Sequence, residues 1–194
     1  QKGLIINNLK IRSLLLIIFF ALSIYSCDKK SRISGQFKKF HPVIITFSGP
    51  DVDEYTNPNP FLDYKLTVEF IHSKSGAKYN VPGYYAADGN AANTGANSGN
   101  KWRVKFCPEK AGEWRYTVSF LQGQNVAVAS SEKGQPHSFH GQTGSFNIQE
   151  VKPRVRNFRS RGILRYSKAG YLRFSGSNKY FIKVGPNSPE NFLA

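Results

Sequence analysis

The chain has 194 residues, a net charge of +15 and 2 cysteines. This length suffices for one domain with its own hydrophobic core, and so few cysteines exclude a scaffold built on disulfides. Residues 1–40 hold 8 lysines and arginines against 1 acid, residues 41–150 hold 9 against 10, and residues 151–194 hold 10 against 1. Nucleic-acid binding needs a basic face on the folded body. Because the middle of the chain is nearly neutral, no nucleic-acid partner is expected.

The N-terminal segment has the pattern of an export signal. Basic residues precede an apolar run from Leu14 to Tyr25, which has the length of a signal-peptide core and is too short to span a bilayer. The run leads to Ser26-Cys27-Asp28, which resembles a bacterial lipoprotein signal, in which the cysteine is lipidated. We interpret residues 1–27 as a lipoprotein-type signal peptide and residues 28–35 as a tether, with a plain secretory signal as the alternative. The expected location is the outer membrane or cell surface, held by the lipid anchor, or the periplasm.

Residues 36–150 have the pattern of half-buried strands. Apolar and polar residues alternate over 66–70, 102–106 and 114–120, which indicates antiparallel strands with one face in a core. Further short strand-like runs, separated by turn residues, lie at 43–47, 79–84, 126–129 and 145–148. We therefore predict an all-β fold, an immunoglobulin-like antiparallel β-sandwich. Trp102 and Trp114 lie on the apolar faces of their strands and are expected in its core.

One long loop and the residues before it supply candidate binding groups. The loop at 86–100 is rich in small and polar residues, and loops of this length are usually functional or disordered. Asp88 offers carboxylate oxygens, but the spacing does not match an EF-hand, so calcium is the less favoured alternative and no cofactor or metal is expected. Tyr84 and Tyr85 cannot both face the core of a regular strand. One of them is therefore available to stack on a sugar.

Three stretches together resemble a known family. They read NPNPFLDYKLTVEF, YNVPGYYAADGNAANTGANSGNKWRVKFCPEKAGEW and FRSRGILRYSKAGYLRFSGSNKYFIKVGPNSPENFLA. The resemblance is to the domain of unknown function 5060 family, an Ig-like module at the N-terminus of secreted bacterial glycoside hydrolases, also described as collagen-binding. It extends from about residue 36 to the end of the chain. In such proteins a (β/α)8 barrel with the catalytic carboxylates follows the sandwich.

The resemblance implies a role for residues 151–194. Within them a β-hairpin at 162–174 is expected as the linker, followed by the truncated start of the catalytic barrel. Glu190 and Asn191 are then candidates for hydrogen bonds to a sugar at the edge of the cleft, with a helix-capping turn as the alternative. Arg161 belongs to a basic stretch that can bind anionic glycans. The favoured alternative for that stretch is pairing with acids of the barrel, or solvation.

Catalytic chemistry is not expected within this chain. Glycoside hydrolysis generally needs two carboxylates, and residues 151–194 offer only Glu190, so no catalytic residue is assigned. The expected function is that of a non-catalytic N-terminal module of an exported, polysaccharide-degrading glycoside hydrolase. Its expected partners are its own downstream barrel, a polysaccharide or oligosaccharide (neutral or anionic) and, through the lipid, a membrane. The alternative is a self-standing carbohydrate-binding or adhesion lipoprotein, which a stop codon after Ala194 would favour.

Overall fold

The computed structural model describes residues 31–129, 133–151, 158–167 and 170–182. The proposed lipidation site Cys27 and the candidate residues Glu190 and Asn191 lie outside these ranges. Within them, no helix has both the length and the apolar character that crossing a membrane requires. The regular secondary structure of these residues consists almost entirely of antiparallel β-strands.

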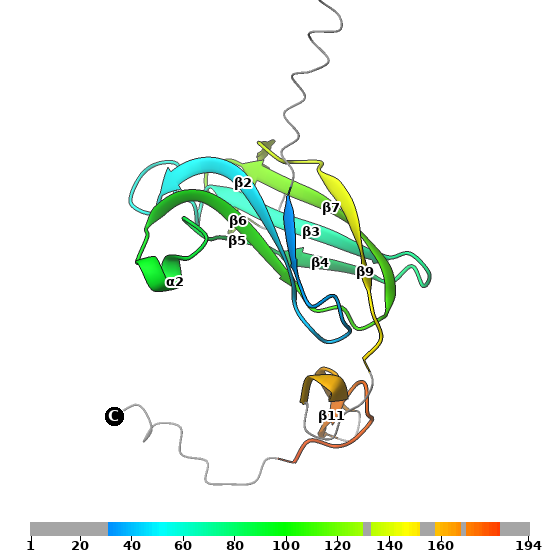
Figure 1. The fold of residues 1–194 in the computed structure, drawn as a ribbon. Coiled ribbons are helices and arrows are strands. Elements are labelled where there is room, and N and C mark those ends of the chain that lie inside the picture. The colour runs from blue at the N-terminus through cyan, green and yellow to red at the C-terminus, as the bar shows by residue number, and fades with distance from the viewer. Residues whose placement is uncertain (1–30, 130–132, 152–157, 168–169, 183–194) are drawn as a thin grey trace, which may run out of the picture. The chain divides into compact units, whose positions relative to one another are not determined.

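Two sheets form the sandwich (Figure 1). The first has the strand order β1-β2-β6-β5, from Arg32–Gly35, Val43–Asp53, Ser98–Phe106 and Tyr84–Tyr85. The second has the order β4-β3-β7, from Lys78–Pro82, Tyr64–His72 and Gly112–Gln122. Strands β8 (Gln135–Pro136) and β9 (Thr143–Ile148) pair with opposite ends of β7. The predicted immunoglobulin-like β-sandwich is thereby confirmed.

The core lies between the inward faces of these sheets. Burial alternates residue by residue along β3 and along the first part of β7, as period-two patterning requires when one face meets a core. The ring of Phe70 on β3 stacks on that of Phe106 on β6, with 4.2 Å between centroids, which joins the two sheets. Trp102 and Trp114 are both buried, as predicted.

The run at 79–84, predicted as one strand, is divided between the two sheets. β4 ends at Pro82 in one sheet, and β5 begins at Tyr84 in the other. Gly83 makes the crossing, and its N–H donates to Leu66 O over 2.8 Å. A Cβ atom at residue 83 would overlap the Leu66 side chain, so a residue without a side chain is needed for this close approach.

The run at 126–129 was also predicted as a strand, and this is wrong. The N–H of Val126 donates to Gly123 O at 3.1 Å, and that of Val128 to Asn125 O at 3.2 Å, which are turn hydrogen bonds. Asn125 has a φ of 54°, a conformation that asparagine tolerates better than most residues. The neighbour that β7 gains at this end is instead β8.

Residues after the sandwich form the predicted hairpin. A 3-10 helix, η1 (Phe158–Arg161), precedes the antiparallel strands β10 (Leu164–Tyr166) and β11 (Leu172–Phe174). Tyr180 then forms an isolated bridge with Arg173. The expected start of a barrel continues into residues 183–194, which lie outside the described part of the chain.

Candidate functional site

The two adjacent tyrosines of β5 point in opposite directions, as predicted. Tyr85 is only 7 % exposed, and its hydroxyl donates to Val52 O at 2.5 Å or to Gly99 O at 3.1 Å. Its phenol therefore links β5 to β2 and β6 of the same sheet. Tyr84 is 40 % exposed, with the Lys105 ammonium 5.7 Å from its ring centroid. Of the two candidates, Tyr84 is the one whose ring a sugar can reach.

The electrostatics around Tyr85 keep its hydroxyl protonated. Burial raises the pKa of Tyr85 to about 12, and the nearby carboxylates of Asp51 and Glu54 add to the effect. Burial disfavours the phenolate because the charge would lose its hydration, and negative neighbours repel it. Tyr85 thus acts as a hydrogen-bond donor within the sandwich.

Asp88 organises its own loop. Its two carboxylate oxygens accept hydrogen bonds from the Asn90 N–H at 2.6 Å and from the Thr94 hydroxyl at 2.7 Å. These bonds, that from Asn90 first, hold the pKa of Asp88 below its ordinary value. They fix a one-turn helix, α2 (Ala91–Thr94), within the segment that was predicted as an irregular loop. No cluster of three or more His, Cys, Asp or Glu suited to a metal occurs among the described residues.

Arg161 packs against aromatic rings of the hairpin region. Its guanidinium carbon lies 4.6 Å from the ring centroid of Phe158 and 5.8 Å from that of Phe174. Elsewhere in the basic stretch, Arg165 forms an ion pair with Glu109 of the sandwich. The structure therefore does not bring Arg161 together with Tyr84 or Asp88 in any of its pockets described below.

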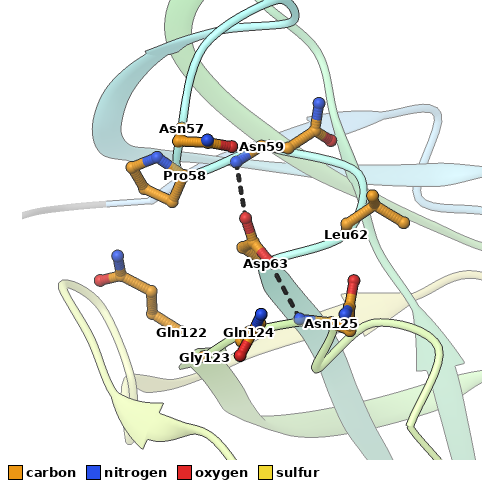
Figure 2. A pocket seen from close by; sticks show the side chains of 9 residues that line it. All are labelled: Asn57, Pro58, Asn59, Leu62, Asp63, Gln122, Gly123, Gln124 and Asn125. Atoms are coloured by element: carbon orange, nitrogen blue, oxygen red, sulfur yellow. Dashed lines mark hydrogen bonds between the residues drawn. The ribbon is translucent and has the colours of Figure 1, made fainter.

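A pocket that the sequence did not predict lies between two loops of the sandwich (Figure 2). Its volume is about 550 Å³, and its lining comes from residues 57–63 and 122–125: Asn57, Pro58, Asn59, Leu62, Asp63, Gln122, Gly123, Gln124 and Asn125. Figure 2 shows the Asp63 carboxylate between the loops, accepting from the Asn59 N–H at 2.8 Å and the Asn125 N–H at 2.9 Å. The feature of the sequence that could have indicated this pocket is the concentration of asparagine and glutamine in both loops.

A smaller pocket of about 230 Å³ shares the first of these loops. Leu62 lines the larger pocket, while its neighbour Phe61 lines the smaller one together with Tyr84 and Lys65. The Phe61 ring is exposed and meets Tyr85 edge-on, with 6.0 Å between centroids. An aromatic surface therefore adjoins the amide-rich pocket.

A third pocket, of about 480 Å³, lies in the hairpin region. Arginines and aromatic residues dominate its lining, which consists of Arg165, Tyr166, Ser167, Arg173, Phe174, Ser175, Asn178 and Tyr180. None of the three pockets is lined by two carboxylates. In the larger pocket of the sandwich, Asp63 is the single acid, and both of its oxygens are already engaged.

Comparison with known proteins finds one family that residues of the sandwich resemble. Residues 36–121 match the family model described as Domain of unknown function (DUF5060), and a comparison with curated proteins gives no match. A solved structure described as a "putative glycoside hydrolase" from Bacteroides vulgatus is similar, with 20 % identity over 74 % of this chain and a TM-score of 0.47. The chain spans about a fifth, 20 %, of that protein's length. Residues 36–121 are thus similar to the DUF5060 family, in agreement with the resemblance stated from the sequence.

Proposed function

We propose that this chain is the non-catalytic N-terminal module of an exported glycoside hydrolase that degrades polysaccharides. The match of residues 36–121 to the DUF5060 family carries the proposal, because the resemblance implies an N-terminal module of such enzymes. In this proposal the catalytic carboxylates belong to a barrel that follows the module, and a lipid on Cys27 holds the protein at a membrane surface.

The acids of the sandwich support a non-catalytic role. A glycosidase places two carboxylates about 5–10 Å apart, one of them kept protonated as the general acid. Here Glu69, Glu113 and Glu150 each face a lysine or arginine, with N–O distances of 3.5, 3.7 and 3.1 Å. Each of these carboxylates is thus engaged with a cation, and none of them lines a pocket described above. Asp63 binds two backbone N–H groups and lacks a second acid in its pocket.

The hairpin supports a bracing role. Tyr166, Tyr171, Tyr180 and Ile182 are all exposed there, and the rings of Tyr171 and Tyr180 lie 6.0 Å apart. Exposed apolar side chains that lie next to one another are typical of an interaction surface, whereas singly scattered ones are normal on any protein. We assign this surface to contact with the barrel.

Activity of the intact protein tests this proposal. The product of the whole reading frame is expected to release sugars from at least one member of a panel of plant and algal glycans, while the 194-residue chain is expected to release none. Removing the module should lower the melting temperature of the barrel. A stop codon directly after Ala194, or a downstream region without carboxylates after its strands, would contradict the proposal and favour a binding lipoprotein.

Labelling with a palmitate analogue tests the membrane anchor separately. Wild-type protein expressed in a bacterial host should incorporate the label, and the Cys27→Ala variant should not. Equal labelling of both proteins would exclude lipidation at Cys27 without bearing on the role of the sandwich.

A further inference from the structure

We propose that the pocket between residues 57–63 and 122–125, the amide pocket, binds an uncharged segment of a polysaccharide. This inference rests on the proposed function and deepens it, since it names the site and the chemical class of the glycan. Four properties of the described residues support it: a rigid frame, free amide groups, the absence of free charge, and an adjoining aromatic surface.

Hydrogen bonds hold the frame of the amide pocket. Besides the two bonds that Asp63 accepts, its carbonyl accepts from the Gly123 N–H at 3.0 Å, and the Leu62 carbonyl accepts from the Ala127 N–H at 3.0 Å. The Asn59 side chain is fixed as well, because it donates to Glu54 O at 2.9 Å and accepts from the Phe61 N–H at 2.9 Å. Two loops far apart in sequence thus have one fixed arrangement, which lowers the entropic cost of binding.

The remaining amide groups are free to contact a ligand. The side chains of Asn57, Gln122, Gln124 and Asn125 line the pocket, and none of them hydrogen-bonds another residue in the described part of the chain. Each amide offers two N–H donors and one carbonyl acceptor. A sugar hydroxyl is both donor and acceptor, so neighbouring hydroxyls of a glycan match such a lining.

The charge of the pocket favours a neutral glycan over an anionic one. No lysine or arginine lines it, and both carboxylate oxygens of Asp63 accept hydrogen bonds from backbone N–H groups. A sulfate or uronate placed there would lose hydration without gaining a cation, which is costly. The hairpin pocket with Arg165 and Arg173 has the opposite character, so the two sites differ in the ligands they can accept.

The shape of the site suits a segment of a longer chain. Its volume of about 550 Å³ lies within the range of ligand pockets, roughly 300–1,000 Å³. Leu62 and Pro58 supply apolar surface for the C–H faces of a sugar ring. Phe61 and Tyr84 line the smaller pocket, which shares this loop with the amide pocket. A glycan that extends from the amide pocket along the loop therefore has aromatic rings on which it can stack.

Binding by the 194-residue chain tests the inference. The probes are neutral oligosaccharides (cello-, xylo-, manno- and laminari-oligosaccharides), with alginate and carrageenan oligosaccharides as the anionic comparison. Titration calorimetry should detect binding of at least one neutral probe. The double variant Gln122→Ala, Gln124→Ala should bind that probe at least about tenfold more weakly, a loss of about 1.4 kcal/mol.

Matched controls separate this effect from a general loss of amides. Asn80 on β4 and Gln149 after β9 are exposed amides outside the pocket, so Asn80→Ala and Gln149→Ala should bind like wild type. The melting temperatures of all variants should agree. Failure of every neutral probe to bind, equal affinity of the double variant, or preference for the anionic probes would overturn the inference.

The two proposals fail in distinguishable ways. An intact protein that hydrolyses glycans while its module binds none would overturn the amide-pocket inference alone. A chain that binds a neutral glycan while the intact protein releases no sugar would support the amide pocket and contradict the proposed enzyme.

Discussion

The sandwich and the hairpin place the same kinds of side chain in opposite environments. Trp114 is 0 % exposed between the sheets, whereas Tyr166 and Tyr180 of the hairpin region are 76 % and 54 % exposed. Two facing sheets cover each other's apolar faces. A hairpin of two three-residue strands is marginal by itself, and of the residues of β10 and β11 only Phe174 is buried. The sandwich therefore supplies its own stability, and the hairpin is suited to be covered by something else.

The largest expected effect tests whether the sandwich core is self-sufficient. Trp114→Ala should reduce the free energy of unfolding by about 3–5 kcal/mol, because it removes a fully buried ring. It also removes the donor to Lys110 O, at 3.0 Å. Urea denaturation followed by circular dichroism measures the change. The matched variant Tyr166→Ala in the hairpin should change the free energy by less than about 0.5 kcal/mol. Similar losses of free energy of unfolding in the two variants would contradict the view that the sandwich, and not the hairpin, supplies the stability.

A pH-dependent effect sharpens the description of the sandwich interior. The pKa of Tyr85 is raised from 10.0 to about 12, chiefly by burial, so the unfolded chain releases its phenolic proton first as the pH rises. The stability that this shift contributes is complete below about pH 10 and is lost between about pH 10 and 12, by roughly 2–3 kcal/mol. Tyr85→Phe should be less stable than wild type at pH 8, and the difference should shrink at pH 11.

Denaturation at both pH values measures that difference. Tyr84→Phe, which removes the hydroxyl of the exposed tyrosine of the same strand, serves as the control. If the difference in free energy of unfolding between Tyr85→Phe and wild type were equal at pH 8 and pH 11, the raised pKa of Tyr85 would be contradicted.

Two carboxylates of the sandwich, one bonded within it and one paired with the hairpin, should also differ in their contributions. Asp63→Ala leaves the N–H groups of Asn59 and Asn125 without their acceptor, so we expect a loss of about 1–3 kcal/mol. Glu109→Ala breaks the ion pair with Arg165, in which the Arg165 side chain is 56 % exposed and the Glu109 side chain 18 % exposed. Because solvent reaches the arginine side of the pair, we expect a loss of about 1 kcal/mol or less. Denaturant unfolding of both variants tests this order. A greater loss for Glu109→Ala would show that the hairpin contributes more to stability than its exposure indicates.

The sequence predicted the features that repeat along a strand. Alternation located β3, β6 and β7 and placed Trp102 and Trp114 in the core, and the same period separated Tyr84 from Tyr85. These predictions succeeded because a strand shows its burial pattern within a few residues. Period two says nothing about turns, which is why residues 126–129, an apolar run without polar alternation, were wrongly assigned to a strand.

The amide pocket could not be derived in this way. It exists because Asp63 accepts a hydrogen bond from Asn125, 62 residues further along the chain, and such a bond leaves no periodic trace. Asp88 was a comparable case: its carboxylate suggested an open oxygen ligand, but short-range bonds to Asn90 and Thr94 engage both oxygens. In both cases the hydrogen-bond partners, rather than the residue type, determined the role.

The smallest expected effect on stability concerns two exposed tyrosines of the hairpin region, and the same substitutions are informative in the intact protein. Tyr171 and Tyr180 contact each other on an exposed surface, so replacing both with serine should change the free energy of unfolding of the 194-residue chain by less than about 0.5 kcal/mol each. If the proposed barrel exists and covers these rings, the same double variant of the intact protein removes buried aromatic area and should lower its melting temperature clearly. Differential scanning calorimetry on both lengths of protein measures this contrast, and Tyr55→Ser, an exposed tyrosine of the sandwich, is the control. A double variant that is neutral at both lengths would show that this surface of the hairpin is not where the barrel binds.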